Sequence, residues 1–290
     1  MTSHPVVSVI VPAYNSEPLL RDFLGACQAS RYRDFEVIIN DDLRSTDGTE
    51  ALVDRFRADG LDVTYLRENR SMAQGRKRGA AEARGSILLH LDSDMKVTPA
   101  LIGECADLLA GDYDALVIPE ESFGTTFWAR CKWLEKKIYE GVDQIESLRC
   151  VRRDIYDKLG GHDERMVFSE DKDFDLRVRK AGYKIGRTRS FLYHNEGDLR
   201  LYRTMRKKMG YSGTADLFAT EHPEAFRWQT NIFHRFGLYL RNFPYAFSHP
   251  LLYGGLWTMK IGEFGFGALG HLRRRMATRT PGRGVRGGAA

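Results

Sequence analysis

Two aspartates, Asp92 and Asp94, stand one residue apart at the end of a short apolar run over residues 87–91. The run favours β-structure and follows Gly85, so it predicts a strand buried on both faces. In open parallel α/β sheets, ligands gather at the carboxyl ends of the strands. Two carboxylates there repel each other unless a cation lies between them, and Mg²⁺ that also holds phosphate oxygens suits such a pair. Alternatively, the aspartates only form a turn or cap a helix.

Short apolar runs alternate with amphipathic segments around these aspartates. The spacing predicts strands over residues 6–11, 35–39, 63–66, 87–91, 116–118 and 150–152, and helices from Glu17, around 52–56, over 73–84, after Pro99 and over 123–139. This alternation predicts an α/β fold with a doubly wound, mostly parallel sheet. The loop at Tyr14 and the pairs Asp41–Asp42 and Asp92–Asp94 would then lie at strand ends, which favours one shared site.

The composition is that of a globular protein, but its charge is uneven along the chain. A length of 290 residues suffices for one large α/β domain with an appendage, and we expect residues 1–198 to form that domain. Residues 199–272 are predicted to form a helical extension, and residues 273–290 a disordered basic tail. That tail holds six arginines and no acid, so the rest of the chain is nearly neutral and no nucleic-acid partner is expected.

The cysteine pattern and the absence of long apolar stretches predict a cytoplasmic protein. No cysteine belongs to a CxxC pair, so we expect all four to be reduced core residues: Cys27, Cys105, Cys131 and Cys150. The apolar run over residues 6–11 is too short for a signal segment. A membrane-spanning helix is not expected, because Lys260 and Glu263 interrupt the most apolar stretch, residues 251–272.

The polar residues of the predicted site suit a metal, a diphosphate and a nucleoside. Tyr14 offers a ring on which a base can stack, or it is half-buried packing. Asp41 or Asp42 can accept a hydrogen bond from a base or a ribose hydroxyl, or both are turn formers. Arg76 can reach phosphate with its guanidinium fork, or it belongs to a solvated helix face. Asp92 and Asp94 would bind ribose and the metal.

A second acidic cluster could supply a base. Asp171 follows Glu170 and precedes Asp173 and Asp175, so like charges are expected to raise its pKa toward a useful value. Ser169 before these acids predicts a helix N-terminus, with the acids favoured by the helix dipole. Asp171 would deprotonate an attacking hydroxyl; the alternative is that it only caps this helix.

The motifs taken together resemble the family 2 glycosyltransferases. They are Val-Ile-Val-Pro-Ala-Tyr-Asn over 9–15, Asp41-Asp42, Ser-Thr-Asp-Gly-Thr over 45–49, Arg76, Leu-Asp-Ser-Asp over 91–94 and Glu170-Asp171. The resemblance covers about residues 6–194. It implies a GT-A fold, a nucleotide-diphosphate sugar donor, most commonly a UDP-sugar, with Mg²⁺ or Mn²⁺, and inversion at the anomeric carbon by a hexosyltransferase.

The resemblance also implies roles for single residues. It assigns nucleoside binding to Pro12, Tyr14 and Asn15, to the Asp41–Asp42 pair and to Arg76. It assigns ribose and metal contacts to Asp92 and Asp94, and the general base to Asp171. His194 matches a position where some members place a further metal ligand; otherwise it is a hydrogen-bonded core residue. The acceptor would be a glycan or a lipid-linked molecule.

Several features depart from the family pattern. Leu43 and Arg44 lengthen the turn after the paired aspartates, so either one could meet the base. The Gln-x-x-Arg-Trp signature of processive synthases is only partly echoed over 224–228, which favours transfer of one or a few sugars. A sugar-nucleotide pyrophosphorylase is disfavoured, because the first loop lacks a glycine-rich phosphate cradle. A non-catalytic nucleotide-sugar-binding protein would have no need of Asp171.

The apolar C-terminal part allows two interpretations. Residues 243–275 are dense in aromatic and aliphatic side chains and end in three arginines. They form the core of a helical subdomain, or they lie in a membrane interface, which would make the protein peripheral on the cytoplasmic membrane face. The aromatic density and basic flank favour the interface. The basic segment over 199–209 is either a solvated face or a phosphate contact.

Overall fold

The computed structural model describes residues 6–166, 169–211 and 215–279. The N-terminal two thirds of the chain hold ten strands and the first seven helices. The strands are β1 (Val7–Ala13), β2 (Phe35–Asp42), β3 (Val63–Asn69), β4 (Ile87–His90), β5 (Met95–Val97), β6 (Ala115–Val117), β7 (Glu120–Phe123), β8 (Leu148–Arg152), β9 (Ile185–Arg187) and β10 (Leu192–Asn195). The helices are α1 (Glu17–Gln28), α2 (Thr49–Ala58), α3 (Met72–Glu82), α4 (Leu101–Ala110), α5 (Phe127–Tyr139), α6 (Arg153–Lys158) and α7 (Glu170–Lys180).

The main sheet has seven strands in the order β3-β2-β1-β4-β8-β6-β9. Strands β1 to β4 pair in parallel, whereas β8 runs antiparallel to both neighbours, β4 and β6. Side chains alternate between its two faces, as strand geometry requires. Val9 and Val11 pack under α1, α2 and α4, while Ile10 packs with α3, α6 and α7 on the other face. The predicted α/β fold with a mostly parallel, doubly wound sheet is confirmed.

A second sheet of three strands, in the order β5-β10-β7, sets residues from distant parts of the chain side by side. Strand β10 pairs antiparallel with β5, placing His194 opposite Met95, and parallel with β7, placing His194 opposite Ser122. Residues 120–123 therefore form a strand, and the helix predicted from residue 123 begins at Phe127.

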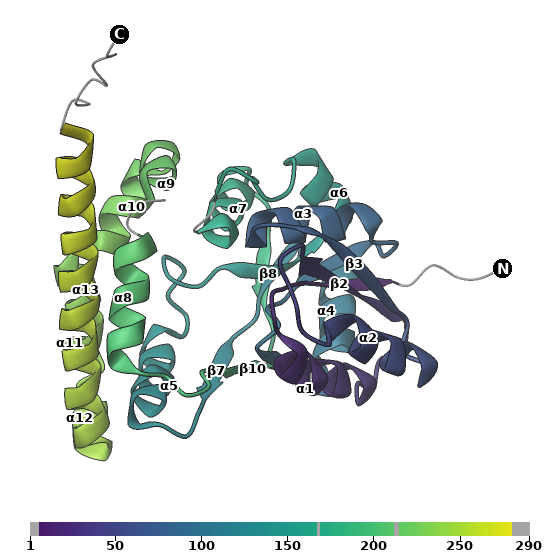
Figure 1. The fold of residues 1–290 in the computed structure, drawn as a ribbon, viewed down its shortest axis with the longest axis horizontal. Helices are drawn as coiled ribbons and strands as arrows, with labels where there is room; N and C mark the ends of the chain where they lie inside the picture. Colours follow the sequence, from purple (N-terminus) through teal and green to yellow (C-terminus); the bar gives the residue numbers. More distant parts are fainter. Residues whose placement is uncertain (1–5, 167–168, 212–214, 280–290) are drawn as a thin grey trace, which may run out of the picture.

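Helices make up the described part of the chain after the second sheet. They are α8 (Leu201–Tyr211), α9 (Ala215–Glu221), α10 (Pro223–Thr230), α11 (Ile232–Arg241), α12 (Pro244–Ser248) and α13 (Pro250–Arg279). Figure 1 shows α13 as a long rod beside α8, on the side of the molecule away from the N-terminus. Helix α13 runs beyond the predicted boundary at residue 272, so residues 273–279 are helical rather than disordered; residues 280–290 lie outside the described residues.

The two charges that interrupt the apolar stretch of α13 point inward. Lys260 and Glu263 are 6% and 7% exposed, and they form a buried ion-pair cluster with Lys132 and Glu135 of α5. An apolar cluster that includes Leu134, Tyr239 and Leu256 surrounds it. This core holds the helical extension to the rest of the chain.

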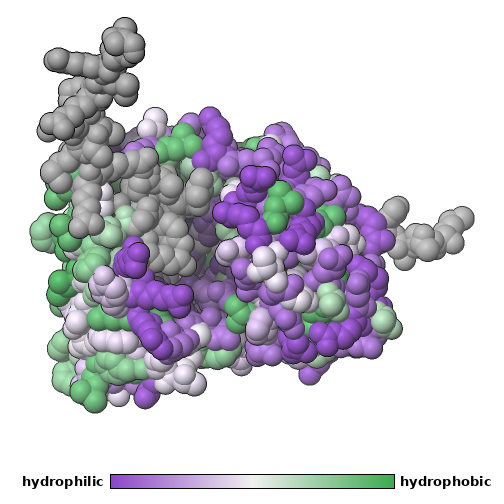
Figure 2. All heavy atoms as spheres, in the orientation of Figure 1, coloured by the Kyte–Doolittle hydropathy of each residue, from purple (hydrophilic) through white to green (hydrophobic). Residues whose placement is uncertain are grey.

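The opposite side of the helical extension exposes apolar side chains. Figure 2 shows this hydrophobic edge, which lies over α11, α12 and α13 in Figure 1. Its most exposed members are Phe233, Phe247 and Leu251, at 82%, 77% and 80% exposure. Residues 243–275 thus contribute to both a core and an exposed apolar edge. Within the described residues, no helix has the length and apolarity needed to cross a bilayer.

Candidate active site

The carboxyl ends of β1, β2 and β4 bring the loops predicted to form the site together. The register sets Ala13 opposite Asp41 and Ile10 opposite His90. Ser93 donates to Ser16 at 3.1 Å, and the Asn15 N–H donates to Ser45 Oγ at 3.1 Å. The predicted convergence of three strand ends is therefore observed.

The loop after β1 exposes Tyr14 and Asn15 to solvent, whereas Pro12 just before them is tightly packed. Tyr14 is 55% exposed, and the Arg44 guanidinium carbon lies 5.5 Å from the centroid of its ring. Pro12 is buried against α3. A Cβ on Gly75 would lie only 2.7 Å from the Pro12 Cβ, so this approach requires glycine.

The two aspartates after β2 are both engaged. Asp41 is 1% exposed and accepts from Ser45 Oγ at 2.6 Å and Tyr65 OH at 3.0 Å; burial raises its pKa. Asp42 accepts two hydrogen bonds from the Arg44 side chain at 2.8 and 2.7 Å, which lower its pKa. The side chain of Arg44, which lies in the lengthened turn, therefore forms an ion pair with Asp42. Both aspartates stabilise the loop in this structure.

Arg76 is buried in the centre of the site rather than on a solvated face. It is 3% exposed, and its Nη2 lies 2.6 Å from Asp92 Oδ1 while its Nε lies 3.5 Å from Glu170. Arg149 approaches the other oxygen of Asp92 at 3.4 Å. Burial favours the neutral form of Asp92, but the two arginines outweigh it and lower the pKa. In this structure, Asp92 is thus paired with two arginines, and the predicted sharing of a cation with Asp94 stays a prediction.

Asp94 and His194 form the part of the site best suited to a divalent cation. His194 Nε2 lies 3.3 Å from Asp94 Oδ2, and the buried Asp94 Oδ1 has no hydrogen-bond partner among the described residues. Burial disfavours the charged imidazole, but Asp94 and Glu120 outweigh it and raise the His194 pKa to about 10. The carboxylates beside His194 therefore favour a positive charge at this position.

The protein alone does not complete a metal site. No group of three or more His, Cys, Asp or Glu side chains in the described ranges has metal-binding geometry. Asp94 and His194 would contribute two donor side chains, and Mg²⁺ sites in proteins often take their remaining ligands from water and substrate phosphates. The unpartnered oxygen of Asp94 fits such a partial site.

Glu120 and Arg149 belong to the site but were not predicted from the sequence. Arg149 donates to Glu120 Oε1 through Nε at 2.8 Å and Nη2 at 2.5 Å, and Glu120 Oε2 lies 3.4 Å from His194 Nδ1. These contacts connect the Asp92 and Asp94 ends of the site. The available signal was an arginine inside the apolar run Leu148–Val151, because a charged residue in a buried strand needs a partner.

Helix α7 begins after Ser169 with three acids in its first turn, as predicted. Ser169 has a left-handed backbone (φ 64°) and its side chain makes no cap hydrogen bond. The raised carboxyl pKa falls on Glu170, at about 7, because burial outweighs the Arg76 charge and Asp171 adds repulsion. The pKa of Glu170 therefore lies near neutrality, above that of an ordinary carboxyl group.

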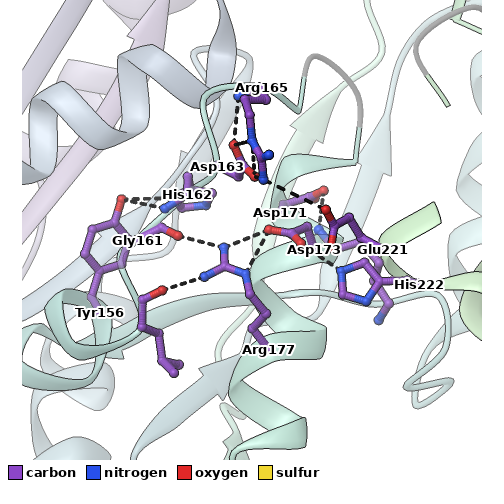
Figure 3. Close-up of polar contacts among 12 residues, drawn as sticks. Tyr156, Gly161, His162, Asp163, Arg165, Asp171, Asp173, Arg177, Glu221 and His222 are labelled. Atoms are coloured by element: carbon purple, nitrogen blue, oxygen red, sulfur yellow. Dashed lines mark hydrogen bonds and ion pairs between the residues drawn. The ribbon is translucent and has the colours of Figure 1, made fainter. Parts of the chain in front are cut away.

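Asp171 is the acid of α7 that faces open space. Asp175 is fully buried and pairs with Lys172 at 2.7 Å. Asp173 accepts from Arg177 at 2.7 Å and lies 2.7 Å from His222 Nε2, a contact that joins α7 to the helical extension (Figure 3). These two acids are engaged in structural contacts, whereas Asp171 lines a cavity.

The cavity has a volume of about 670 Å³ and separates α7 and the sheets from the helical extension. Asp171, Glu120 and Arg149 line it on one side. The opposite side consists of residues from α9, α10, α11 and α13, among them Asp216, Phe218, Phe226, Gln229, Thr230, Arg235, Lys260, Glu263, Phe264 and Gly267. The cavity therefore extends from Asp171, which accepts a hydrogen bond from the Lys172 N–H, to the edge of the Asp92–Asp94 site.

The sequence and the fold resemble known glycosyltransferases. The family model described as glycosyl transferase family 2 matches residues 8–160. An uncharacterised glycosyltransferase, YfnE of Bacillus subtilis, is 42% identical over 175 residues, which cover 58% of this chain and 43% of YfnE. An undecaprenyl-phosphate 4-deoxy-4-formamido-L-arabinose transferase of Pseudomonas fluorescens is 26% identical over 185 residues, covering 58% of this chain and 53% of the relative. The chain thus spans about half the length of these relatives or less.

Two solved structures share the fold. A mannosyltransferase of Pyrobaculum calidifontis, in complex with GDP-Man and Mn²⁺, has a TM-score of 0.63 at 19% identity and covers 94% of this chain and 89% of its own. TarS 1-349 of S. aureus, in complex with UDP-GlcNAc, has a TM-score of 0.56 at 16% identity and covers 94% and 92%. At these identities the likeness concerns the fold, which is that of GT-A glycosyltransferases.

Proposed function

Because the chain belongs to glycosyl transferase family 2, we propose that it transfers a hexose from a nucleotide-diphosphate sugar to a hydroxyl acceptor with inversion. One observation carries this proposal. Asp171, Glu120 and Arg149 line the same cavity, and the last two contact His194 and Asp92. The proposed base and the proposed diphosphate site would thus border one cavity. We further propose residues 1–198 as the transferase domain and residues 199–272 as the extension that encloses the acceptor.

The donor would lie across the carboxyl ends of β1, β2 and β4. The exposed Tyr14 ring suits stacking of a base, and the loop of Pro12 and Asn15 with Asp41 and Asp42 would surround the nucleoside. Arg76 would act through Asp92 rather than by reaching phosphate itself, because its Nη2 is bound to that carboxylate. A UDP-sugar is our proposed donor.

The proposed reaction is a single displacement. Asp171 accepts the proton of the acceptor hydroxyl while that oxygen attacks the anomeric carbon on the face opposite the diphosphate. The bond between the anomeric carbon and the phosphate oxygen breaks, and its electron pair leaves with the nucleotide diphosphate. A divalent cation bound by Asp94 and His194 would supply positive charge for the departing group.

A donor panel tests this function against the alternatives. We expect a nucleotide sugar, with Mn²⁺ present, to raise the melting temperature and then to be turned over with release of the nucleotide diphosphate. Binding without turnover would indicate a non-catalytic nucleotide-sugar-binding protein. Release of pyrophosphate from a nucleoside triphosphate and a sugar phosphate would indicate a pyrophosphorylase. No response to any nucleotide sugar would contradict the proposal.

We expect Asp94→Asn and His194→Ala each to raise the Mn²⁺ concentration needed for half-maximal turnover by about 10- to 100-fold. The reason is that each change removes one of two protein donors. Titration of turnover with Mn²⁺ measures the effect, and Glu121→Gln is the control, since Glu121 pairs with Lys137 away from His194. An unchanged Mn²⁺ requirement in both variants would remove these residues from the metal site.

We also propose that the exposed apolar edge of α11, α12 and α13 rests on an anionic membrane surface, which would give access to a lipid-linked acceptor. Its exposed aromatic and aliphatic side chains and the arginines that follow residue 272 support this. We expect Phe247→Ser with Leu251→Ser to reduce co-sedimentation with phosphatidylglycerol-containing vesicles by about tenfold or more, because each change removes an apolar side chain. Equal co-sedimentation of variant and wild type would contradict the proposal.

A further inference from the structure

The cationic side chains that line the cavity are almost all paired. Of the five cationic side chains that the described residues contribute to the lining, four have carboxylate partners: Lys132 with Glu135, Lys136 and Arg149 with Glu120, and Lys260 with Glu263. Glu146, also in the lining, pairs with Arg187. These charges of the cavity lining are therefore largely neutralised by partners within the protein.

Arg235 of α11 is the exception. Among the residues that the structure describes, no carboxylate oxygen lies within 4.0 Å of its guanidinium nitrogens, and neither Nη atom has a hydrogen-bond partner. Its Nε donates only to the Gln229 carbonyl, at 3.4 Å. The guanidinium lies 5.0 Å from the Tyr139 ring centroid and 6.0 Å from that of Trp228. Two aromatic rings thus hold this cation at the cavity wall.

We infer that Arg235 binds an anionic group, a phosphate or a carboxylate, on the acceptor; this rests on the proposed function. A guanidinium that is held on aromatic rings is already oriented, and its free Nη groups match two oxygens of such an anion. Asp171 lines the same cavity, so an acceptor anchored by its anion at Arg235 can present a hydroxyl to Asp171.

The other unpaired charges of the lining do not argue for a cationic acceptor. Asp171 is needed as the base. Asp216 is exposed, where water and salt screen its charge. Arg235 is partly buried against its two rings and is screened less. An acceptor therefore gains more from an anion at Arg235 than from a cation at Asp216.

Matched sugars test the inference by binding. Titrations of glucose 6-phosphate, glucuronate and glucose are made into protein saturated with UDP and Mn²⁺, which occupies the donor site. We expect either anionic sugar to bind at least about tenfold more tightly than glucose. Which of the two binds better identifies phosphate or carboxylate as the recognised group. Equal affinity for all three, or no binding of the anions, would overturn the inference.

Two substitutions at Arg235 distinguish recognition by its guanidinium from a general attraction of anions to positive charge. Arg235→Gln should abolish the preference for the anions, and Arg235→Lys should keep part of it, since lysine retains the charge without the fork. Arg241→Gln, at an exposed position of α11 outside the cavity lining, should leave it unchanged. An undiminished preference in Arg235→Gln would overturn the inference. UDP and Mn²⁺ binding and donor turnover, measured on the same proteins, report on the proposed function independently.

Discussion

Replacement of Asp171 by asparagine is expected to lower transferase turnover by about 10²- to 10⁴-fold while donor binding is unchanged. Asparagine has nearly the same shape but cannot accept the acceptor proton. Asp171 lines the cavity and has no ion-pair partner among the described residues, so the change breaks no salt bridge. Turnover with the preferred donor, together with donor affinity from titration calorimetry, measures the two effects separately.

Asp216→Asn is the matched control for this experiment. Asp216 is an exposed acid in the lining of the same cavity but lies on the helical extension. We expect it to change turnover by no more than about threefold, since an exposed charge is screened. If Asp171→Asn kept most of the wild-type turnover, or if both variants lost it equally, Asp171 would not be the base.

Replacement of Lys260 by methionine is expected to lower the free energy of unfolding by about 3–5 kcal/mol. Lys260 bridges Glu135 of α5 and Glu263 of its own helix, and all three side chains are almost fully buried. Methionine fills a similar volume but removes the buried cation that Glu135 and Glu263 share. Chemical denaturation measures the loss as a shift of the midpoint at constant slope.

A double variant distinguishes the stability lost by breaking the Lys260–Glu263 ion pair from the stability lost through poorer packing. Lys260→Met with Glu263→Leu removes both partners of α13 and leaves the Lys132–Glu135 pair intact. We expect it to recover most of the lost stability, because apolar replacement of both partners of a buried pair is often neutral. Lys184→Met, at an exposed pair with Asp112, should cost less than about 1 kcal/mol. A double variant as unstable as the single one would contradict this account.

The main buried strands and the acids at their ends could be predicted because both follow local rules. Apolar runs mark buried strands, and parallel strands place their carboxyl ends at one edge. The pairing of Asp94 with His194 depends instead on the register of β10 against β5, which joins segments about 100 residues apart. The sequence alone left His194 open between ligand and core residue for that reason.

The partners of the site charges could not be predicted. Asp92 was expected to bind a cation together with Asp94. In the structure, Arg76 of α3 and Arg149 of β8 contact its carboxylate. Lys260 and Glu263 were visible only as interruptions of an apolar stretch. In the structure they point inward, because Lys132 and Glu135 of α5 form the rest of the ion-pair cluster. Charge pairing across a fold leaves no periodic signal in the sequence.

The anomeric configuration of the sugar after transfer tests the central claim most directly. Proton NMR of the product formed from an α-linked UDP-sugar, taken before mutarotation where water is the acceptor, distinguishes the two anomers. One displacement, with Asp171 as base, predicts the β product. An α product would mean that the configuration is retained, and it would contradict direct attack by a hydroxyl deprotonated at Asp171.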